Sequence, residues 1–265
     1  LTPAVLMRAR KVTDTVCKLQ RSADYGEIIE ARLAQTIRAQ GHDSTELTKS
    51  QSTIPNVFGL EYLNSSKPLA HIGDSLKKQA ECRICLYGPP GTGKTTLGHW
   101  LAAETDRTLH IKKASDLLGP FLGQTERALA RAFEEASEEN AILMIDEVDS
   151  FLQERASAER QWQVQQVNEF LTQMESFSGT FIASTNLMDG IDKAALRRFD
   201  LKLKFDYLRE EQITRLFTNH VRNLGVKGHI GRATQEVASL GNCTPGDFAN
   251  VVRQHRFRQI GRAHV

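Results

Sequence analysis

The segment GPPGTGKT, at residues 88–95, constrains the fold of this chain more than any other part of the sequence. Four residues separate two glycines, and Lys and Thr follow the second glycine, which is the P-loop pattern. The apolar run RICLY (83–87) precedes the segment and the helical pattern TLGHWLAAE (96–104) follows it. The sequence therefore predicts a strand that leads through a phosphate-binding loop into a helix.

The residue types in this loop predict a site for ATP and Mg²⁺. Glycines let the backbone turn tightly, so that N–H groups of residues 91–95 point at phosphate oxygens at a helix N-terminus. Lys94 is expected to neutralise the β and γ phosphates, and the Thr95 hydroxyl is expected to bind the metal together with Asp146. The residues that we expect to bind the nucleotide are Gly88, Pro89, Pro90, Gly91, Thr92, Gly93, Lys94, Thr95, Thr96 and Asp146.

Short apolar runs alternate with longer amphipathic stretches from Arg83 to Phe205. The runs are RICLY (83–87), TLHIK (108–112), AILMI (141–145), TFIAST (180–185) and LKLKF (201–205). Strand, helix and strand in repetition imply parallel pairing with right-handed crossovers. We therefore predict an α/β fold with a parallel five-stranded sheet sandwiched by helices, followed by a small helical domain in which the strand patterns stop.

The expected domain boundaries follow these changes in pattern. We expect an N-terminal helical segment and linker over 1–53, an α/β nucleotide-binding domain over 54–206, and a truncated helical small domain over 207–259. The last six residues, IGRAHV (260–265), read like one frame of a sequencing adapter, so we expect a non-native tail on a fragment of a longer protein.

Composition excludes several classes of protein. The 34 Lys and Arg residues balance 32 Asp and Glu residues to a net charge of +2, which gives no overall footprint for nucleic acid or an anionic membrane. The longest aliphatic run, 141–145, is far shorter than the roughly 20 residues that span a bilayer. Four cysteines are too few for a disulfide scaffold. We expect a cytoplasmic protein with no membrane partner.

Polar side chains follow two of the predicted central strands. Asp146 and Glu147 end the run AILMI, where doubly wound sheets bind ligands. Asp146 is expected to hold Mg²⁺ and Glu147 to polarise water for in-line attack on the γ phosphate. Asn186 ends the next central strand, where its amide can position that water or touch the γ phosphate. Taken singly, the acidic pair also fits a plain strand end, and Asn186 also fits a turn.

The order and spacing of these motifs, together with LRRFD (196–200), resemble an AAA-family ATPase module over about 54–258. The resemblance implies Mg²⁺-dependent ATP hydrolysis that remodels or threads a macromolecule, with a polypeptide favoured, in a homo-oligomeric ring that is a hexamer by analogy. Arg197 and Arg198 match two arginines that reach a neighbouring subunit's nucleotide. The LRRFD segment is most similar to microtubule-severing members, and it leaves open how Arg197 and Arg198 divide the work.

The same resemblance assigns two further segments. PFLGQTE (120–126) is similar to the first pore loop, in which Phe121, Leu122 and Gly123 are expected to grip a polypeptide, although Phe121 alone fits a core position equally well. TPGDF (244–248) is similar to a helix start beside the nucleotide.

Two other functions stay open. One is a DNA-directed loader or remodeller. The basic stretch RQHRFR (253–258) favours this function, and the near-neutral net charge argues against it. The other is a scaffold that binds ATP without hydrolysing it, which the presence of every expected catalytic residue disfavours.

Overall fold

The computed structural model describes residues 58–119, 121, 123–152, 161–186, 192–223 and 231–252. Contacts divide the chain into two compact units, Leu1–Thr53 and Ile54–Val265, and every described residue belongs to the second. The predicted segment 1–53, the tail 260–265, the basic stretch 253–258 and Leu122 lie outside the described residues.

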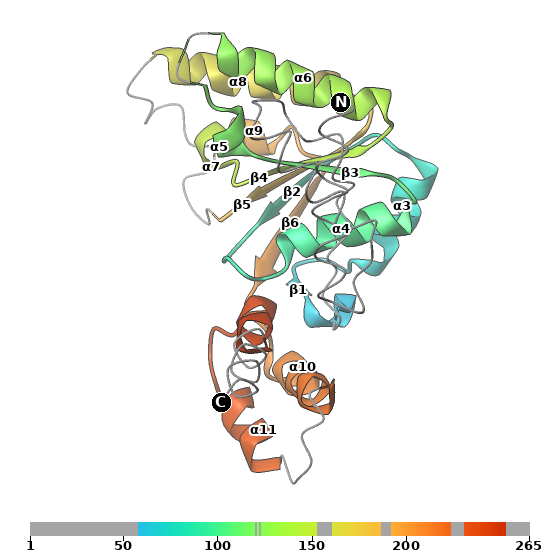
Figure 1. The fold of residues 1–265 in the computed structure, drawn as a ribbon, viewed down its shortest axis with the longest axis vertical. Helices are drawn as coiled ribbons and strands as arrows, with labels where there is room; N and C mark the ends of the chain where they lie inside the picture. The colour runs from blue at the N-terminus through green and yellow to red at the C-terminus, as the bar shows by residue number, and fades with distance from the viewer. Residues whose placement is uncertain are drawn as a thin grey trace, which may run out of the picture. The chain divides into compact units, whose positions relative to one another are not determined.

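Six strands form one sheet in the order β1-β6-β2-β5-β4-β3 (Figure 1). The five predicted strands are confirmed to within one residue at each end, and all pairs among them are parallel. The sixth strand, β1, lies at one edge of the sheet and pairs antiparallel with β6. Because β1 is only two residues long, it has no sequence periodicity, and the sequence could not predict this strand. The strands are β1 (Asn64–Ser65), β2 (Cys82–Tyr87), β3 (Leu109–Lys113), β4 (Ile142–Asp146), β5 (Thr180–Thr185) and β6 (Leu201–Asp206).

Helices cover both faces of this sheet because successive residues of a strand point to opposite faces. In β4, Leu143 and Ile145 join the core under α6 (Gln124–Glu138) and α8 (Gln161–Ser176). Ile142 and Met144 join a second core, to which α3 (Ala70–Lys78) and α4 (Lys94–Glu104) contribute. Figure 1 shows these two pairs of helices on opposite sides of the sheet. The central strands are therefore apolar at nearly every position.

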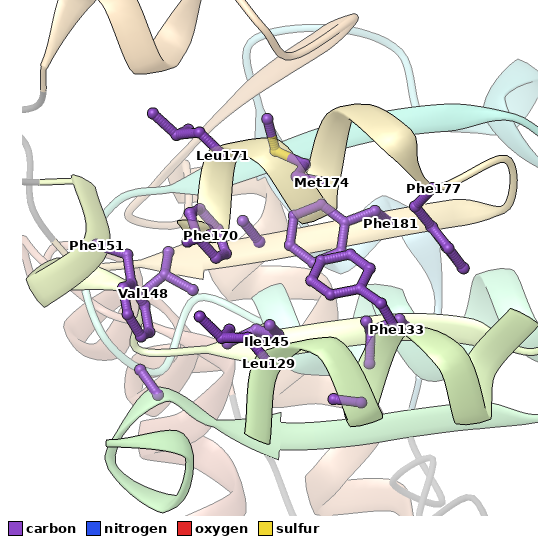
Figure 2. Packing of buried hydrophobic residues seen from close by; sticks show 14 of the residues in the cluster. Leu129, Phe133, Ile145, Val148, Phe151, Phe170, Leu171, Met174, Phe177 and Phe181 are labelled. Carbon is purple, nitrogen blue, oxygen red and sulfur yellow. The ribbon is translucent and has the colours of Figure 1, made fainter. Parts of the chain in front are cut away.

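Aromatic rings fill the core between the sheet and helices α6 and α8 (Figure 2). Phe181 of β5 lies with its ring centroid 5.3 Å from that of Phe133 and 5.9 Å from that of Phe170. Phe170 stacks in turn on Phe151 at 5.0 Å. Phe133 of α6 and Phe170 of α8 are both buried. This core fixes the strand ends from which the site is built.

In the described part of the chain, four short helices connect the larger elements: η1 (Leu60–Tyr62), α5 (Ala114–Leu117), α7 (Asp149–Leu152) and α9 (Lys193–Leu196). After β6 the described chain is helical, in α10 (Glu210–Asn223), α11 (Gly231–Ala238) and residues 245–252. Ile213 and Leu216 of α10 pack with Tyr62 in a third apolar cluster, which ties this helical part to η1. Across the described residues, every helix is too short or too polar to cross a bilayer.

Candidate active site

Gly88 and Gly91 show why the loop between β2 and α4 needs residues without side chains. Gly88 follows β2 with φ +141°, and a Cβ there would lie 2.1 Å from the carbonyl oxygen of Phe205. Gly91 has φ +77°, and a Cβ there would lie 2.8 Å from Oγ1 of Thr244. Side chains would therefore both strain and block the loop. The glycines hold the predicted loop close to neighbouring backbone, and α4 begins directly after it at Lys94.

Lys94 carries a buried positive charge. The residue is 7% exposed, and its Nζ donates to the carbonyl oxygens of Gly88 at 2.8 Å and Pro89 at 2.9 Å, and to Oδ1 of Asn186 at 2.9 Å. All three acceptors are neutral, and within the described ranges Lys94 forms no ion pair. Burial lowers the pKa of Lys94, with Asp146 opposing that shift. An anion beside Nζ would stabilise the charged form, so the loop fits a phosphate group.

Thr95 and Asp146 come together from different elements. Oγ1 of Thr95, in the first turn of α4, donates to Oδ2 of Asp146 at 3.0 Å, at the end of β4. A hydroxyl beside a carboxylate suits Mg²⁺, which takes few protein ligands and keeps its remaining sites for water and phosphate oxygens. Among the described residues there is no cluster of three or more acidic, His or Cys ligands that would favour another metal. The donor set therefore fits Mg²⁺ held with a nucleotide.

Two hydroxyl groups that the sequence reasoning missed hold the acidic residues in place. Ser184 and Thr185, both buried at the end of β5, donate to Oδ1 of Asp146 and Oδ1 of Asp149. The available indication was a Ser-Thr pair at the end of an apolar strand, directly before Asn186. The buried hydroxyls therefore link β5 to the acidic turn after β4.

Glu147 lies in a strained turn directly after β4. Its φ is +59°, in the left-handed region, which costs a residue other than glycine about 1–3 kcal/mol. Its backbone N–H donates to Oδ1 of Asp146 at 3.0 Å, which fixes the turn. The Glu147 side chain is exposed and lines the same cavity as Lys94. A carboxylate in this position can accept a proton from water that enters the cavity.

A cavity of about 370 Å³ brings together seven of the ten predicted nucleotide-binding residues, with Glu147 and Asn186; Gly88, Pro89 and Thr92 are not in its lining. Its walls come from the loop and first turn of α4, from the ends of β4 and β5, and from the start of the helix at 245–252. The amide of Gly246 donates to the carbonyl oxygen of Gly91 at 3.0 Å, which joins that helix to the loop. The lining residues are Pro90, Gly91, Gly93, Lys94, Thr95, Thr96, Asp146, Glu147, Asn186, Pro245, Gly246 and Ala249.

A smaller and mainly apolar cavity of about 40 Å³ adjoins the first. The two share Gly93, Thr96, Pro245 and Ala249. His220 lines the smaller cavity, and its ring stacks on Phe248 with centroids 5.9 Å apart. Sequence reasoning missed the residues found only here, since they form no motif and meet only in the folded chain. Those residues are Phe58, Tyr62, Leu63, Leu216 and His220.

Arg197 and Arg198 lie at the opposite edge of the sheet from the cavity. β6 runs parallel to β2, and Leu201 pairs with Ile84, so the two arginines lie near the start of β2. The loop begins at Gly88, at the end of β2, about 16 Å further along the strand than Arg83. The structure therefore does not bring the arginines to the cavity of their own chain.

Phe121 is 70% exposed, so it is not a core residue. Gly123, with φ +80°, precedes α6, and the N–H of Gln124 donates to the carbonyl oxygen of Phe121 at 3.2 Å. The described part of the predicted Phe-Leu-Gly step thus presents an aromatic ring to solvent.

Residues 84–207 match the model of a family described as ATPase family associated with various cellular activities (AAA). The chain is 34% identical over 203 residues to ATP-dependent zinc metalloprotease FtsH of Ureaplasma parvum serovar 3, covering 69% of this chain and 28% of that protein.

Two further relatives come from eukaryotes. The chain is 33% identical over 144 residues to vacuolar protein sorting-associated protein 4 of Dictyostelium discoideum, covering 52% of this chain and 32% of the relative. It is 31% identical over 186 residues to ATPase family gene 2 protein of Schizosaccharomyces pombe, covering 68% of this chain and 23% of that protein. The matched region spans a third or less of each of these three relatives.

Proposed function

The chain contains an ATPase module of the AAA family, and from this premise we propose that the protein hydrolyses ATP within a homo-oligomeric ring, a hexamer by family analogy, to remodel or thread a polypeptide. The observation that carries the proposal is Lys94. It is a buried cation, held by neutral oxygens, on the wall of a cavity large enough for a phosphate chain. A triphosphate supplies the anionic oxygens that this ammonium group needs.

We propose that the nucleobase lies where the smaller cavity opens into the phosphate-binding cavity, because about 40 Å³ alone is too little space for a base. The smaller cavity adjoins the phosphate-binding cavity through Gly93 and Thr96, and its walls are mainly apolar. Burial lowers the pKa of His220, which favours a neutral ring beside a flat, uncharged base. The two adjoining cavities suit a ligand with an anionic end and an aromatic end.

Hydrolysis in this proposal depends on four side chains: Asp146 and Glu147 at the end of β4, Asn186 after β5, and Thr95 in the first turn of α4. Glu147 accepts a proton from the attacking water, and Asn186 orients that water or the γ phosphate. Thr95 and Asp146 would hold Mg²⁺, which when bound supplies positive charge for the phosphate oxygens. The bond between Lys94 and Asn186 supports this arrangement, since it brings the end of β5 to the phosphate-binding loop.

The position of the arginines supports action between subunits. Arg197 and Arg198 lie near the start of β2, while the loop lies at its end. In a ring, the arginines of one subunit can reach the nucleotide that is bound to the neighbouring subunit, although they cannot reach the nucleotide of their own subunit. Phe121, exposed on the turn before α6, is the residue that we propose to contact a polypeptide substrate.

The test is the rate of phosphate release per subunit, measured against protein concentration, with and without an unfolded polypeptide such as reduced, carboxymethylated lactalbumin. We expect the rate per subunit to rise as rings assemble and to rise further with the polypeptide. The Glu147→Gln variant should bind ATP and lose about 10²- to 10⁴-fold in turnover. The matched control is Glu134→Gln, which changes an exposed glutamate of α6.

The alternative functions give different results in the same assay. Unchanged phosphate release in Glu147→Gln would contradict hydrolysis at this site. If the wild type binds ATP but releases no phosphate, the protein is a scaffold that binds ATP without hydrolysing it. Stimulation by DNA instead of polypeptide, lost steeply with added salt, would indicate a nucleic-acid target.

A further inference from the structure

Phe121 lies on a tight turn that leads into α6. At the base of this turn the N–H of Gly119 donates to Oγ1 of Thr125 at 3.1 Å. The two ends of the turn approach so closely that a Cβ at Gly119 would lie 2.5 Å from Cβ of Gln124. Gly123, in the left-handed region with φ +80°, lets the chain enter α6 directly after the turn. The position of Phe121 therefore depends on what holds Thr125.

Thr125 is a buried polar residue in the first turn of α6. It is 0% exposed, and its hydroxyl oxygen accepts from the N–H of Gly119 and from Nε2 of Gln166, the latter at 3.0 Å. Gln166 belongs to α8 and lies 41 residues further along the chain. A hydroxyl oxygen has two lone pairs, so these two donors use both of them. The amide of Gln166 thus ties the base of the turn to α8.

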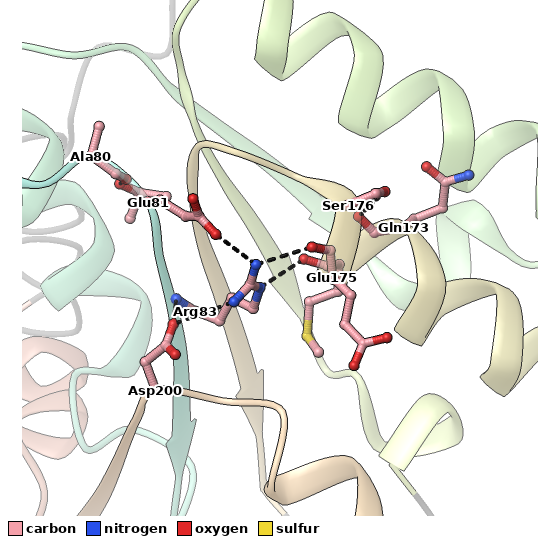
Figure 3. A network of polar contacts seen from close by, with 9 residues as sticks. Ala80, Glu81, Arg83, Gln173, Glu175, Ser176 and Asp200 are labelled. Atoms are coloured by element: carbon pink, nitrogen blue, oxygen red, sulfur yellow. Dashed lines mark hydrogen bonds and ion pairs between the residues drawn. The ribbon is translucent and has the colours of Figure 1, made fainter.

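α8 is itself fixed to the sheet at its other end (Figure 3). Arg83 of β2, with an 18% exposed side chain, donates from Nε to the carbonyl oxygen of Met174 and from its NH2 group to that of Glu175, both at 3.0 Å. These carbonyls lie in the last turn of α8, where a cation is favourable. Gln166 is therefore presented by a helix whose own position is held by β2.

The middle of α8 packs on the segment that follows the acidic pair of the site. Phe170, about one helical turn after Gln166, stacks on Phe151 of α7 with ring centroids 5.0 Å apart, and Figure 2 shows both rings in the core. α7 begins two residues after Glu147. α8 therefore joins the turn before α6 to the segment that leads away from the acidic pair.

We infer that Gln166 is a positioning residue: through Thr125 it fixes the turn that presents Phe121 to a polypeptide. The inference rests on the proposed contact between Phe121 and the substrate. Phe121 is 70% exposed, so packing of its own ring holds it only weakly, and the turn beneath it must supply the order. Without the amide of Gln166 the turn populates more conformations, and a polypeptide that binds only one of them binds more weakly.

The test replaces Gln166 with Met, which has a similar length and no donor. It uses the full chain at concentrations where the rate per subunit has levelled. The concentration of reduced, carboxymethylated lactalbumin that gives half-maximal stimulation should rise about 2- to 10-fold, the effect of one hydrogen bond. Gln166→Asn keeps the amide on a shorter side chain and should show the same rise. Thr125→Ser keeps the hydroxyl group and should behave like the wild type.

Gln173→Met is the matched control. Gln173 lies on the same helix, near the end held by Arg83, and its Nε2 donates to Oε1 of Glu169 at 2.8 Å (Figure 3). The same substitution here breaks a contact inside α8 instead of one to α6, so stimulation should match that of the wild type. Thermal unfolding is measured for both variants. Basal and stimulated rates that fall together in Gln166→Met, with a loss of thermal stability, would assign Gln166 a purely structural role and overturn the inference.

Binding measured directly removes the dependence on hydrolysis. In the Glu147→Gln background with ATP, the anisotropy of fluorescein-labelled lactalbumin gives a Kd for the polypeptide. Adding Gln166→Met should raise this Kd by the same factor as the half-maximal concentration, and adding Gln173→Met should leave it unchanged. An equal Kd with and without Gln166→Met would overturn the inference.

Phe121→Ala distinguishes failure of this inference from failure of the proposed function. Because Gln166 acts through Phe121, the double variant Phe121→Ala/Gln166→Met should be no worse than Phe121→Ala. Full stimulation of Phe121→Ala would refute the proposed contact with a polypeptide, and the inference with it. If Phe121→Ala loses stimulation while Gln166→Met keeps that of the wild type, the proposed contact stands and the positioning role of Gln166 is overturned.

Discussion

The Nζ atom of Lys94 lies 2.9 Å from Oδ1 of Asn186, although 92 residues separate the two in the sequence. The contact exists because β2 and β5 are parallel neighbours, so the segments after both strands meet at one edge of the sheet. Asp146 reaches the same edge from β4 on the other side of β5. Three strand ends therefore converge on one cavity.

Replacing Lys94 with Ala should weaken ATP binding without unfolding the chain. A charge-assisted hydrogen bond contributes about 1.5–3 kcal/mol, which corresponds to a loss of roughly 10- to 10²-fold in affinity. Titration with a fluorescent ATP analogue measures the change. Lys77→Ala, at an exposed lysine of α3 that pairs with Glu104, should bind like the wild type. Equal affinity in the two variants would contradict the assigned role of Lys94.

Replacing Ala249 with Leu should test the placement of the nucleobase. Ala249 lines both cavities, so a larger side chain narrows the passage into the smaller one. Overpacking costs about 1–3 kcal/mol, and ATP affinity should fall by roughly tenfold or more. Inorganic tripolyphosphate, which has no base, should bind as it does to the wild type. A parallel loss for both ligands would place the base elsewhere.

Replacing Gly88 with Ala should destabilise the fold, and replacing Gly231 with Ala should not. The Gly88 Cβ would meet backbone atoms that cannot move aside, and its φ adds strain. At Gly231, no atom of another described residue lies within 4 Å of an added Cβ. Urea unfolding should show a loss of at least about 1–3 kcal/mol for the first variant and little change for the second. A similar stability of both variants would refute the crowding at Gly88.

Stability should fall as the pH is lowered through 6.5, in part because of His220. Burial lowers the pKa of His220 from its ordinary value of 6.5, so just below that pH the unfolded chain binds more protons than the folded chain. The free energy of unfolding therefore decreases with falling pH until the folded pKa is passed. Urea unfolding at pH 7.5, 6.5 and 5.5 should show a shallower decrease for His220→Gln. The exposed His71→Gln should follow the wild type; a His220→Gln curve that does the same would contradict this origin.

The strands and the phosphate-binding loop were predictable because each depends on a local pattern. Runs such as AILMI are apolar throughout because β4 is covered on both faces, and the glycines of residues 88–93 meet a backbone requirement. Asp146 and Asn186 were found for the same reason, as polar residues at the ends of apolar runs.

The smaller cavity was not predictable in this way. Tyr62 and His220 lie far apart in the sequence, belong to no motif, and meet only when η1 and α10 pack together. The pairing of Arg198 with Glu175 is similar, because it depends on the end of α8 reaching the segment before β6. Motifs indicated the candidate residues of the site, but only the packed structure shows that Arg198, and not its neighbour Arg197, pairs with Glu175 among the described residues.

The hydrogen bond from the Gly246 amide to the Gly91 carbonyl has a mechanical consequence. The peptide group at the start of the final described helix is hydrogen-bonded to the loop that we propose binds the phosphates. A change in the conformation of that loop during turnover would therefore shift the start of this helix through a single hydrogen bond.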